Sequence, residues 1–425
     1  MSDRLRICMV TTFYPPYGFG GDAVFVRRLS RELARRGHDV HVVHCLDAYR
    51  ACGGREPATP PPPDPGVTVH RLDSGLGLLS PLATQQAGRP LFKSRRLREV
   101  LAMGFDVIHY HNVSLVGGPK VLEFGEAAVK LYTMHEAWLI CPTHVLYRFN
   151  RAPCEAPHCF ACTLAHRRPV QWWRYTGLLG RAVRHVDRFL APSAFTRDIH
   201  RERGFHAPIS VLPNFVPLPA ERGNGRSAGG NEPQTGRPSD SHGPPEEPYF
   251  LFVGRLERVK GLHTLVPVMR RWGRAPLLVA GAGSAEAALR RLAGGAPNVR
   301  FLGWLPAERL AALYRGAAAV IVPSVTYEVF PLVALEALSH GTPIIVRRLG
   351  GLPEIAVQSG GGLVYEDDAE LVAALDAVLD EPARRERMGR LGREAVRREW
   401  SADAHLERYF QIIDAHRRRR APARP

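Results

Sequence analysis

Residues 323–343 read PSVTYEVFPLVALEALSHGTP and lie between two short apolar runs, AAVIV and IIV. Pro331 suits the first turn of a helix, which places Glu328 in the preceding loop and Glu336 inside the helix. Glu336 has leucine, valine and alanine as its sequence neighbours, and a carboxylate in such a setting is rarely buried without a partner. Ribose hydroxyls would satisfy it, as at dinucleotide sites, and the alternative is two solvated charges.

Short β-branched runs alternate with helical spacing on both sides of this stretch. Examples are RICMVTT, DVHVVHC and DVIHYHN in the first half, and YFLFVG, PLLVAG and AAVIVPS in the second. Near-continuous apolar strands separated by helices predict parallel sheets that are covered on both faces. Because 425 residues exceed one ordinary core, the two series predict an α/β protein with two doubly wound, Rossmann-like domains.

Composition predicts where these domains begin and end. We expect a first domain over residues 1–216, a disordered Pro/Gly-rich linker over 217–248 and a second domain over 249–400. A closing helix over 401–417, packing back on the first domain, and a basic tail over 418–425 would follow. Ligands of open parallel sheets bind beyond the carboxyl ends of the strands. A cleft between two facing domains is therefore the expected site.

Bulk properties narrow the class of protein. Hydrophobic residues make up 45% and charged residues 23%, as in soluble globular proteins. No apolar stretch approaches the roughly 20 residues of a spanning helix, and the N-terminus lacks a signal-peptide pattern, so a cytoplasmic location is expected. The net charge of +16 would suit an anionic partner, such as nucleic acid, anionic lipid or a phosphorylated substrate, whereas a basic tail and solvated helix faces are the alternative source of the excess. Since no nucleic-acid motif is present, nucleic acid is not the expected partner.

Glycine-rich loops follow the first strand of each half. GFGGDAV contains Gly20 and Gly21, and GRLERVKG contains Gly254, Arg255 and Lys260. A guanidinium and an ammonium beside a helix N-terminus suit a pyrophosphate, whereas plain tight turns and exposed cations are the alternatives. RRLGGLPEI adds a later glycine turn, at residues 350–351.

These motifs together resemble the retaining GT-B glycosyltransferases of family 4, the group 1 type. The resemblance covers residues 249–366 through GRLERVKG, the E-x7-E pair with its preceding PS, and the later G-x-P-I-I-V and GG-x-P-E segments. The first half agrees more loosely, through Gly20-Gly21, the RGHDV strand entry and His135 after a strand.

The resemblance implies a role for each matching residue. Arg255 and Lys260 would hold the diphosphate, Glu336 the ribose, Glu328 the sugar hydroxyls, and His135 the transferred sugar. The catalytic set is therefore Arg255, Lys260, Glu328 and His135. The implied donor-binding residues are Gly20, Gly21, Gly254, Phe330, Glu336, Gly350 and Gly351. Val329 and Pro331 stand where many relatives have glycine, which leaves open how closely the backbone approaches the sugar.

The implied activity is transfer of a hexose-type sugar from a nucleotide-diphosphate sugar to a hydroxyl acceptor, with retention of configuration. The family context is polysaccharide or lipid-linked glycan assembly. No DxD-like metal motif lies in a suitable loop, so no cofactor is expected for transfer; two fixed cations would stabilise the leaving diphosphate. The alternatives are a sugar-phosphate synthase or phosphorylase, and a GT-B scaffold that binds nucleotide or nucleic acid without catalysis.

Two further segments carry specific expectations. Cys141, Cys154, Cys159 and Cys162 suit a structural zinc site that would order the loop after His135, or are coincidental loop cysteines. Disulfides are not expected in a cytosolic chain. RRPVQWWRYTGLLGRAVRHVDR, at 167–188, has the character of a basic amphipathic helix. It would either cover the core or make a peripheral membrane contact, which a lipid-linked acceptor would suit.

Overall fold

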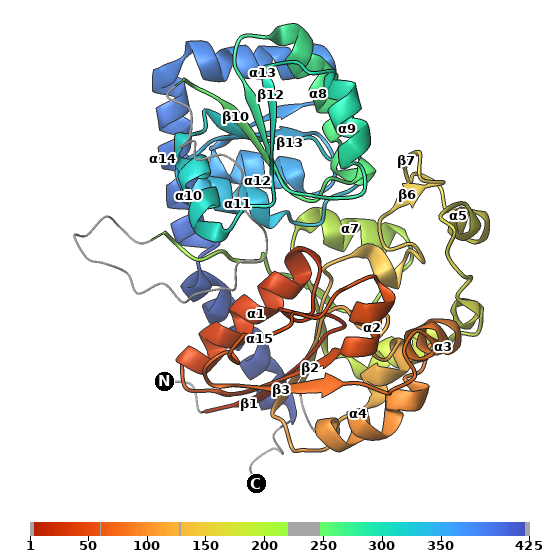
Figure 1. Ribbon diagram of the computed structural model, residues 1–425. Coiled ribbons are helices and arrows are strands. Elements are labelled where there is room, and N and C mark those ends of the chain that lie inside the picture. Colours follow the sequence, from red (N-terminus) through yellow and green to blue (C-terminus); the bar gives the residue numbers. More distant parts are fainter. Residues whose placement is uncertain (1–3, 60, 127–128, 220–246, 421–425) are drawn as a thin grey trace. The chain divides into compact units, whose positions relative to one another are not determined.

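The computed structural model describes residues 4–59, 61–126, 129–219 and 247–420 (Figure 1). The chain divides into two compact units, the first formed by residues 1–213 with 406–425 and the second by 214–405. Most of the predicted linker and the last five residues of the basic tail lie outside the described residues. Within the described part of the chain, no helix is long and apolar enough to cross a membrane.

The first unit contains a seven-stranded sheet with strand order β3-β2-β1-β4-β5-β8-β9, and every neighbouring pair is parallel. Its strands are β1 (Arg6–Val10), β2 (Asp39–Cys45), β3 (Val67–Leu72), β4 (Val107–Tyr110), β5 (Val129–Thr133), β8 (Arg188–Ala191) and β9 (Ile209–Val211). Strands β4 and β5 are buried at every residue, because helices cover both faces of the sheet (Figure 1). The predicted doubly wound pattern is confirmed for this unit.

Helices and short turns connect these strands. The α-helices are α1 (Gly20–Arg35), α2 (Leu46–Ala51), α3 (Leu79–Ala87), α4 (Ser94–Leu101), α5 (Cys159–Ala165), α6 (Leu178–Ala182) and α7 (Ala194–Glu202). The 3-10 turns are η1 (Leu91–Lys93), η2 (Pro119–Glu123), η3 (Ala137–Leu139), η4 (Trp172–Tyr175) and η5 (Val183–His185). Between β5 and β8, a two-stranded antiparallel hairpin of β6 (Tyr147–Arg148) and β7 (Ala152–Pro153) stands off the main sheet with α5 (Figure 1).

The second unit contains a six-stranded sheet with order β12-β11-β10-β13-β14-β15, again parallel throughout. Its strands are β10 (Phe250–Val253), β11 (Leu277–Ala280), β12 (Val299–Gly303), β13 (Ala319–Val322), β14 (Ile344–Arg347) and β15 (Gly362–Tyr365). Around them lie η6 (Arg258–Lys260), α8 (Leu262–Trp272), α9 (Glu286–Ala293), α10 (Ala307–Gly316), α11 (Leu332–Ser339), α12 (Leu352–Ser359), α13 (Asp368–Asp380) and α14 (Pro382–Glu399). Two buried clusters, one on each face of the sheet, form its core.

The last helix, α15 (Ala402–Arg420), begins in the second unit, and from Leu406 onward its residues belong to the first. Its Tyr409 ring is fully buried, and the hydroxyl lies 3.1 Å from Nδ1 of His109 at the end of β4. Phe410 packs on His38, with ring centroids 5.0 Å apart. The last helix therefore completes the core of the unit whose other elements come from the start of the chain.

One sequence expectation is wrong. Residues 167–188 do not form a single helix but three short elements, the 3-10 turns η4 and η5 and the short α-helix α6 between them. The break falls at Gly177, whose φ of 69° lies in the left-handed region that glycine adopts without strain. Within η4, Trp173 is buried and donates from Nε1 to the Gln85 carbonyl, while Trp172 is 60% exposed. Each of the two proposed roles therefore fits only part of this segment.

Candidate functional site

In the second unit, both predicted cations follow β10. Gly254 directly follows the strand, and Arg255 lies at the start of the loop with an exposed guanidinium that contacts Glu257 at 2.7 Å. Lys260 ends η6, one residue before Gly261 and the start of α8. The β10–α8 connection therefore brings a guanidinium and an ammonium to the N-terminal end of a helix, where the helix dipole also favours an anion.

Glu328 lies beside Lys260, although 68 residues separate them in sequence. Nζ of Lys260 donates to Oε1 of Glu328 at 2.7 Å, and the Ser324 hydroxyl donates to the same oxygen at 2.6 Å. Burial by itself would raise the pKa of Glu328, but the charge and hydrogen bond of Lys260, aided by Ser324 and Arg255, lower it below the ordinary value. Glu328 is therefore an ionised carboxylate, and Lys260 is held in place by it.

Glu336 lies on α11, as the sequence predicts, and its Oε2 accepts a hydrogen bond of 3.1 Å from the Tyr314 hydroxyl. Tyr314 comes from α10, is 3% exposed and stacks on His340 with ring centroids 5.4 Å apart. The two-helix contact fixes the direction of the Glu336 carboxylate. Such fixing suits a residue that must meet a pair of ligand hydroxyls.

Glycines hold the loops of this site against one another. A Cβ on Gly261 would lie 1.8 Å from the Pro323 carbonyl oxygen, and one on Gly350 would lie 2.6 Å from the Glu328 carbonyl oxygen. Gly351 donates its N–H to that carbonyl at 2.7 Å. Likewise, a Cβ on Gly281 would lie 1.9 Å from the Gly254 carbonyl oxygen. The space beside Gly350, a predicted donor-binding glycine, is thus filled by the protein's own backbone, as it is beside Gly261 and Gly281. The close contacts of Gly261 and Gly350 bring together the loops that carry Lys260 and Glu328.

The loop between Glu328 and Glu336 accommodates Val329 and Pro331, which stand where many relatives have glycine. Val329 and Pro331 are not among the positive-φ residues of the described chain, so the side chains there cause no backbone strain. Phe330, predicted to bind donor, is 7% exposed and packs edge-on against Trp400 at 6.0 Å. Its side chain belongs to the core, which leaves its backbone for any donor contact.

In the first unit, Gly20 and Gly21 open α1 and are exposed, with Gly20 at a φ of 84°. Next to them, Asp22 accepts a hydrogen bond from the Asn112 amide at 3.5 Å. Burial, and to a lesser extent the neighbouring Glu136 carboxylate, raises the pKa of Asp22 to about 6. The helix start therefore combines accessible backbone with a carboxyl group that titrates near neutral pH.

His135 follows β5 and belongs to a row of three histidines. Its Nε2 lies 2.9 Å from Nδ1 of His111, and the two rings stack at 5.2 Å. His111 in turn lies 4.0 Å, centroid to centroid, from His109 on β4. Between His135 and His111 one ring carries the shared hydrogen and the other accepts it, so the orientation of the His135 imidazole is set by its neighbour.

The four clustered cysteines come together beside the β6–β7 hairpin. They line one hollow with Tyr147, Arg148 and His158. Burial raises the pKa of the Cys159 thiol, and the nearby Cys141 and Cys154 add to the increase. As the side chains stand, no group of three or more His, Cys, Asp or Glu in the described ranges has the geometry of a metal site.

Several residues of these sites were missed in the sequence. Tyr314 and Asp22 gave no signal, because a tyrosine inside a helix and an aspartate at a helix start are both common. His111 and Asn112 could have been found, since HYHN ends a strand at the sheet edge where parallel strands present their ligands. Ser324 stands in the PS dipeptide of the predicted motif, but its bond to Glu328 depends on the loop conformation.

Family models match both halves of the chain. Residues 19–218 match the model for Glycosyltransferase Family 4, and residues 238–395 match that for Glycosyl transferases group 1. The chain is 31% identical over 406 residues to the glycogen synthase of Mycobacterium tuberculosis, covering 92% of this chain and 90% of that protein. It is 30% identical over 436 residues to the D-inositol 3-phosphate glycosyltransferase of Pseudarthrobacter chlorophenolicus, covering 96% and 94%. The chain belongs to the group 1, family 4 glycosyltransferases.

Solved structures show the same fold. Sucrose-phosphate synthase from Thermosynechococcus elongatus aligns over 97% of this chain and 99% of its own length, with a TM-score of 0.71 and 22% identity. Anabaena HepE in complex with UDP aligns over 97% and 100%, with a TM-score of 0.63 and 13% identity. The two parallel α/β sheets are therefore those of a GT-B glycosyltransferase, as the sequence predicts.

Proposed function

We propose that this protein transfers a hexose from a nucleotide-diphosphate sugar to a hydroxyl acceptor, with retention of anomeric configuration and without a metal ion in the transfer step. The observation that carries the proposal is the pair of Lys260 and Glu328, a held ammonium and an ionised carboxylate at the start of α8. The UDP bound in a structural neighbour supports a nucleotide as the ligand.

The proposed chemistry uses charges that are already in place. An ammonium has three donors, so Lys260 can keep its bond to Glu328 and still donate to phosphate oxygens. The bond from sugar C1 to the phosphate oxygen breaks with its electron pair going to the diphosphate, whose charge Lys260 and Arg255 stabilise. The acceptor oxygen attacks C1 from the same face, and its proton passes to the departing phosphate.

Glu328 would hold the sugar during this step. The hydrogen bonds from Lys260 and Ser324 both end on Oε1, which leaves Oε2 as the oxygen that would accept from a sugar hydroxyl. The acceptor is less well defined. One relative is named a glycogen synthase, which implies a glucan. Another is named a D-inositol 3-phosphate glycosyltransferase, which implies a phosphorylated inositol. Polysaccharide or lipid-linked glycan assembly is the context we propose.

The donor is identified by thermal unfolding with UDP, GDP, ADP and their common sugar conjugates. We expect one nucleotide family to raise the Tm by a few degrees, because a ligand that binds only the folded state stabilises it. Glu336→Gln should raise the Kd for that nucleotide about tenfold, since it replaces the carboxylate that would accept hydrogen bonds from both ribose hydroxyls. Glu308→Gln, at an exposed position on α10, is the control with the same loss of charge.

Two results would count against these assignments. Unchanged affinity in Glu336→Gln would remove Glu336 from the ribose site. Failure of every nucleotide to bind would favour the scaffold that binds nucleic acid over the enzyme. For the reaction itself, NMR of the product anomer tests retention of configuration. Turnover measured after chelation tests metal independence. Assays with inorganic phosphate or a sugar phosphate as acceptor test the alternative of a phosphorylase or sugar-phosphate synthase.

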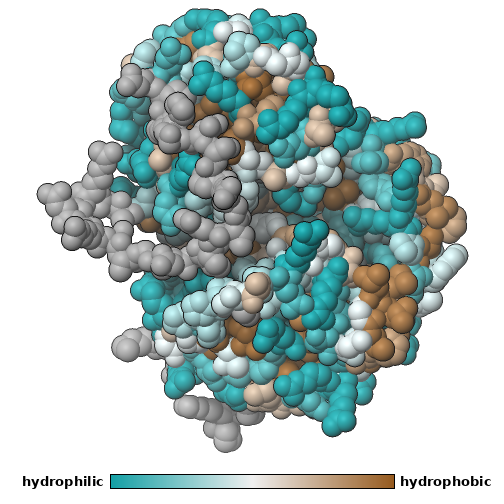
Figure 2. Space-filling view, viewed as in Figure 1, coloured by the Kyte–Doolittle hydropathy of each residue, from teal (hydrophilic) through white to brown (hydrophobic). Residues whose placement is uncertain are grey.

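A peripheral membrane contact would suit a lipid-linked acceptor. Figure 2 shows apolar surface over α3 and around α5 of the first unit, from exposed side chains in two segments. They are Leu76, Leu78, Leu79, Leu82, Leu91, Phe92, Phe160, Leu164, Trp172 and Tyr175. The Trp173–Gln85 hydrogen bond of 2.7 Å joins the two segments, and the exposed Arg89, Arg95 and Arg168 lie close to their residues in sequence. Exposed apolar groups with arginines around them fit an anionic bilayer surface.

Vesicle flotation tests this contact. We expect the protein to float with phosphatidylglycerol vesicles and not with phosphatidylcholine vesicles, because the arginines require anionic headgroups. The double variant Leu78→Ser/Leu79→Ser should float at least several-fold less, since both side chains are 63% exposed and apolar. Val357→Ser, at a 74% exposed position on α12, is the control. Equal flotation of wild type and the double variant would refute the contact.

A further inference from the structure

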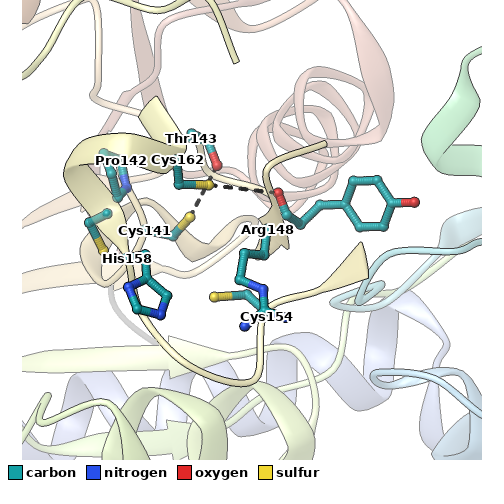
Figure 3. Close-up of a pocket in the computed structure, with 9 residues that line it drawn as sticks. Cys141, Pro142, Thr143, Arg148, Cys154, His158 and Cys162 are labelled. Carbon is teal, nitrogen blue, oxygen red and sulfur yellow. Dashed lines mark hydrogen bonds between the residues drawn. The ribbon is translucent and has the colours of Figure 1, made fainter. Parts of the chain in front are cut away.

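Four cysteines from three elements share one hollow. Cys141 follows η3, Cys154 follows β7, and Cys159 and Cys162 lie three residues apart on α5, so that they share a helix face. Figure 3 shows Cys141 and Cys162 directed toward each other, with Cys154 and His158 on the other side of the hollow. All seven cysteines of the chain are free thiols. The concentration of thiols here is therefore not explained by disulfide bonding.

The segment that contains most of these cysteines has little core packing or regular secondary structure to stabilise it. Residues 142–171 contribute no side chain to the large buried cluster of the first unit, and their only strands are the two-residue β6 and β7. Small structural units without a sufficient core of their own are often stabilised by a disulfide or a metal ion. Five non-glycine residues here have positive φ, which the surroundings must hold: His144, Leu146, Phe149, Asn150 and Arg167.

We propose that Cys141, Cys154, Cys159 and Cys162 bind one structural Zn²⁺, after rotation of their side chains into the hollow that they line. Four thiolates make a closed tetrahedral site for zinc, and each thiol releases its proton to solvent on binding. This inference does not depend on the donor, the acceptor or the transfer mechanism.

The surroundings of the hollow suit such a centre. Sγ of Cys162 already accepts a hydrogen bond of 3.3 Å from the Phe149 N–H, the contact by which a backbone supports a metal-bound thiolate. A zinc ion with four thiolates carries a net charge of about −2. Arg148 lines the hollow, Arg203 donates to the Glu155 carbonyl at 2.8 Å and Arg168 to the Thr143 carbonyl at 3.1 Å. These three guanidinium groups would offset that charge.

The site would stabilise the loop that follows His135. The Cys141 N–H donates to the Ala137 carbonyl at 2.7 Å, and the Ala137 N–H donates to the His144 carbonyl at 3.0 Å. His144 Nδ1 lies 2.9 Å from Oε1 of Glu136, the residue next to His135. A zinc ion bound to Cys141 would therefore stabilise the turn that holds the Glu136 side chain. Glu136 and His135 precede Cys141 by only five and six residues.

Metal analysis of the full chain tests the proposal. The protein is purified with a tag free of histidine, under reducing conditions and without chelator, and zinc is measured by mass spectrometry. We expect about one zinc per chain in wild type and in Cys52→Ser, an exposed cysteine outside the cluster. Cys154→Ser and Cys159→Ala should each lose most of the zinc. Cys159→His should retain it, because imidazole is also a zinc ligand.

Cobalt provides a second measurement, whose wild-type result does not depend on how well the variants fold. After zinc is removed and Co²⁺ is added, wild type should show the intense absorption of a tetrahedral thiolate complex. Cys159→Ala should not show it. The proposal is overturned by wild type that holds no zinc and gives no cobalt spectrum while its thiols are reduced. It is equally overturned by zinc that survives in Cys154→Ser and Cys159→Ala, by bound iron in place of zinc, or by a Cys159–Cys162 disulfide.

Discussion

Lys260→Ala is expected to lower kcat about a thousandfold, while the Kd for the nucleoside diphosphate rises about tenfold or less. The asymmetry arises because negative charge on the diphosphate grows as the sugar departs, so the ammonium contributes more to the transition state than to the bound donor. The substitution also leaves the Glu328 carboxylate without its 2.7 Å partner, which compounds the loss. Transfer assays with the donor found by thermal unfolding measure kcat. Calorimetric titration with the nucleoside diphosphate measures Kd.

Arg258→Ala is the matched control, because Arg258 belongs to the same η6 turn, is exposed, and loses the same charge. It should change kcat less than about threefold, since charges in the exposed part of a turn are screened by solvent. Equal losses of kcat and nucleotide affinity in Lys260→Ala would show that the ammonium binds donor and transition state alike. In that case Lys260 would be a binding residue and not a catalytic one.

Gly261→Ala is expected to destabilise the second unit by about 3 kcal/mol or more, and to abolish transfer. The new Cβ would lie 1.8 Å from the Pro323 carbonyl oxygen, far inside the contact distance. The oxygen belongs to the backbone, and no side-chain rotation can move a Cβ away from it. The φ of 76° adds the cost of a left-handed alanine. To relieve the clash, the turn carrying Lys260 must move away from the segment leading to Ser324 and Glu328. Denaturant unfolding and the transfer assay report the two effects.

Gly273→Ala separates the two causes. Gly273 caps the other end of α8 with a φ of 65°, yet a Cβ there would meet its nearest neighbour only at 3.9 Å. The control should therefore lose about 1 kcal/mol and keep its activity, because it pays for the backbone conformation alone. If the two alanine variants were equally stable, the close approach of Gly261 to Pro323 would not be a feature of the folded protein.

The sequence was sufficient for the two parallel sheets, while the roles of the second-unit site residues stay predictions. Apolar strand runs such as AAVIV marked buried parallel strands, and the acidic pair in an otherwise apolar stretch pointed to Glu328 and Glu336. Family resemblance then supplied the roles. It did not supply the direct bond from Lys260 to Glu328, because that contact joins residues far apart in the chain and depends on two loops meeting.

The glycines show why the rest could not be predicted. In sequence, a glycine that makes room for a ligand looks the same as one that makes room for another loop. Gly281 and Gly350 are of the second kind in this structure, where the Gly254 and Glu328 backbones occupy the space. The 167–188 segment failed for a related reason, since the left-handed Gly177 divides a pattern that reads as one amphipathic helix.

The membership of α15 in the first unit has a consequence for synthesis of the chain. Residues from Leu406 onward leave the ribosome only after the whole second unit, residues 214–405, has been made. At bacterial elongation rates that interval is roughly 10 to 40 seconds. Throughout it, the surface around His109 that receives Tyr409 stays uncovered. The nascent first unit must therefore persist without this part of its core while its neighbour is translated.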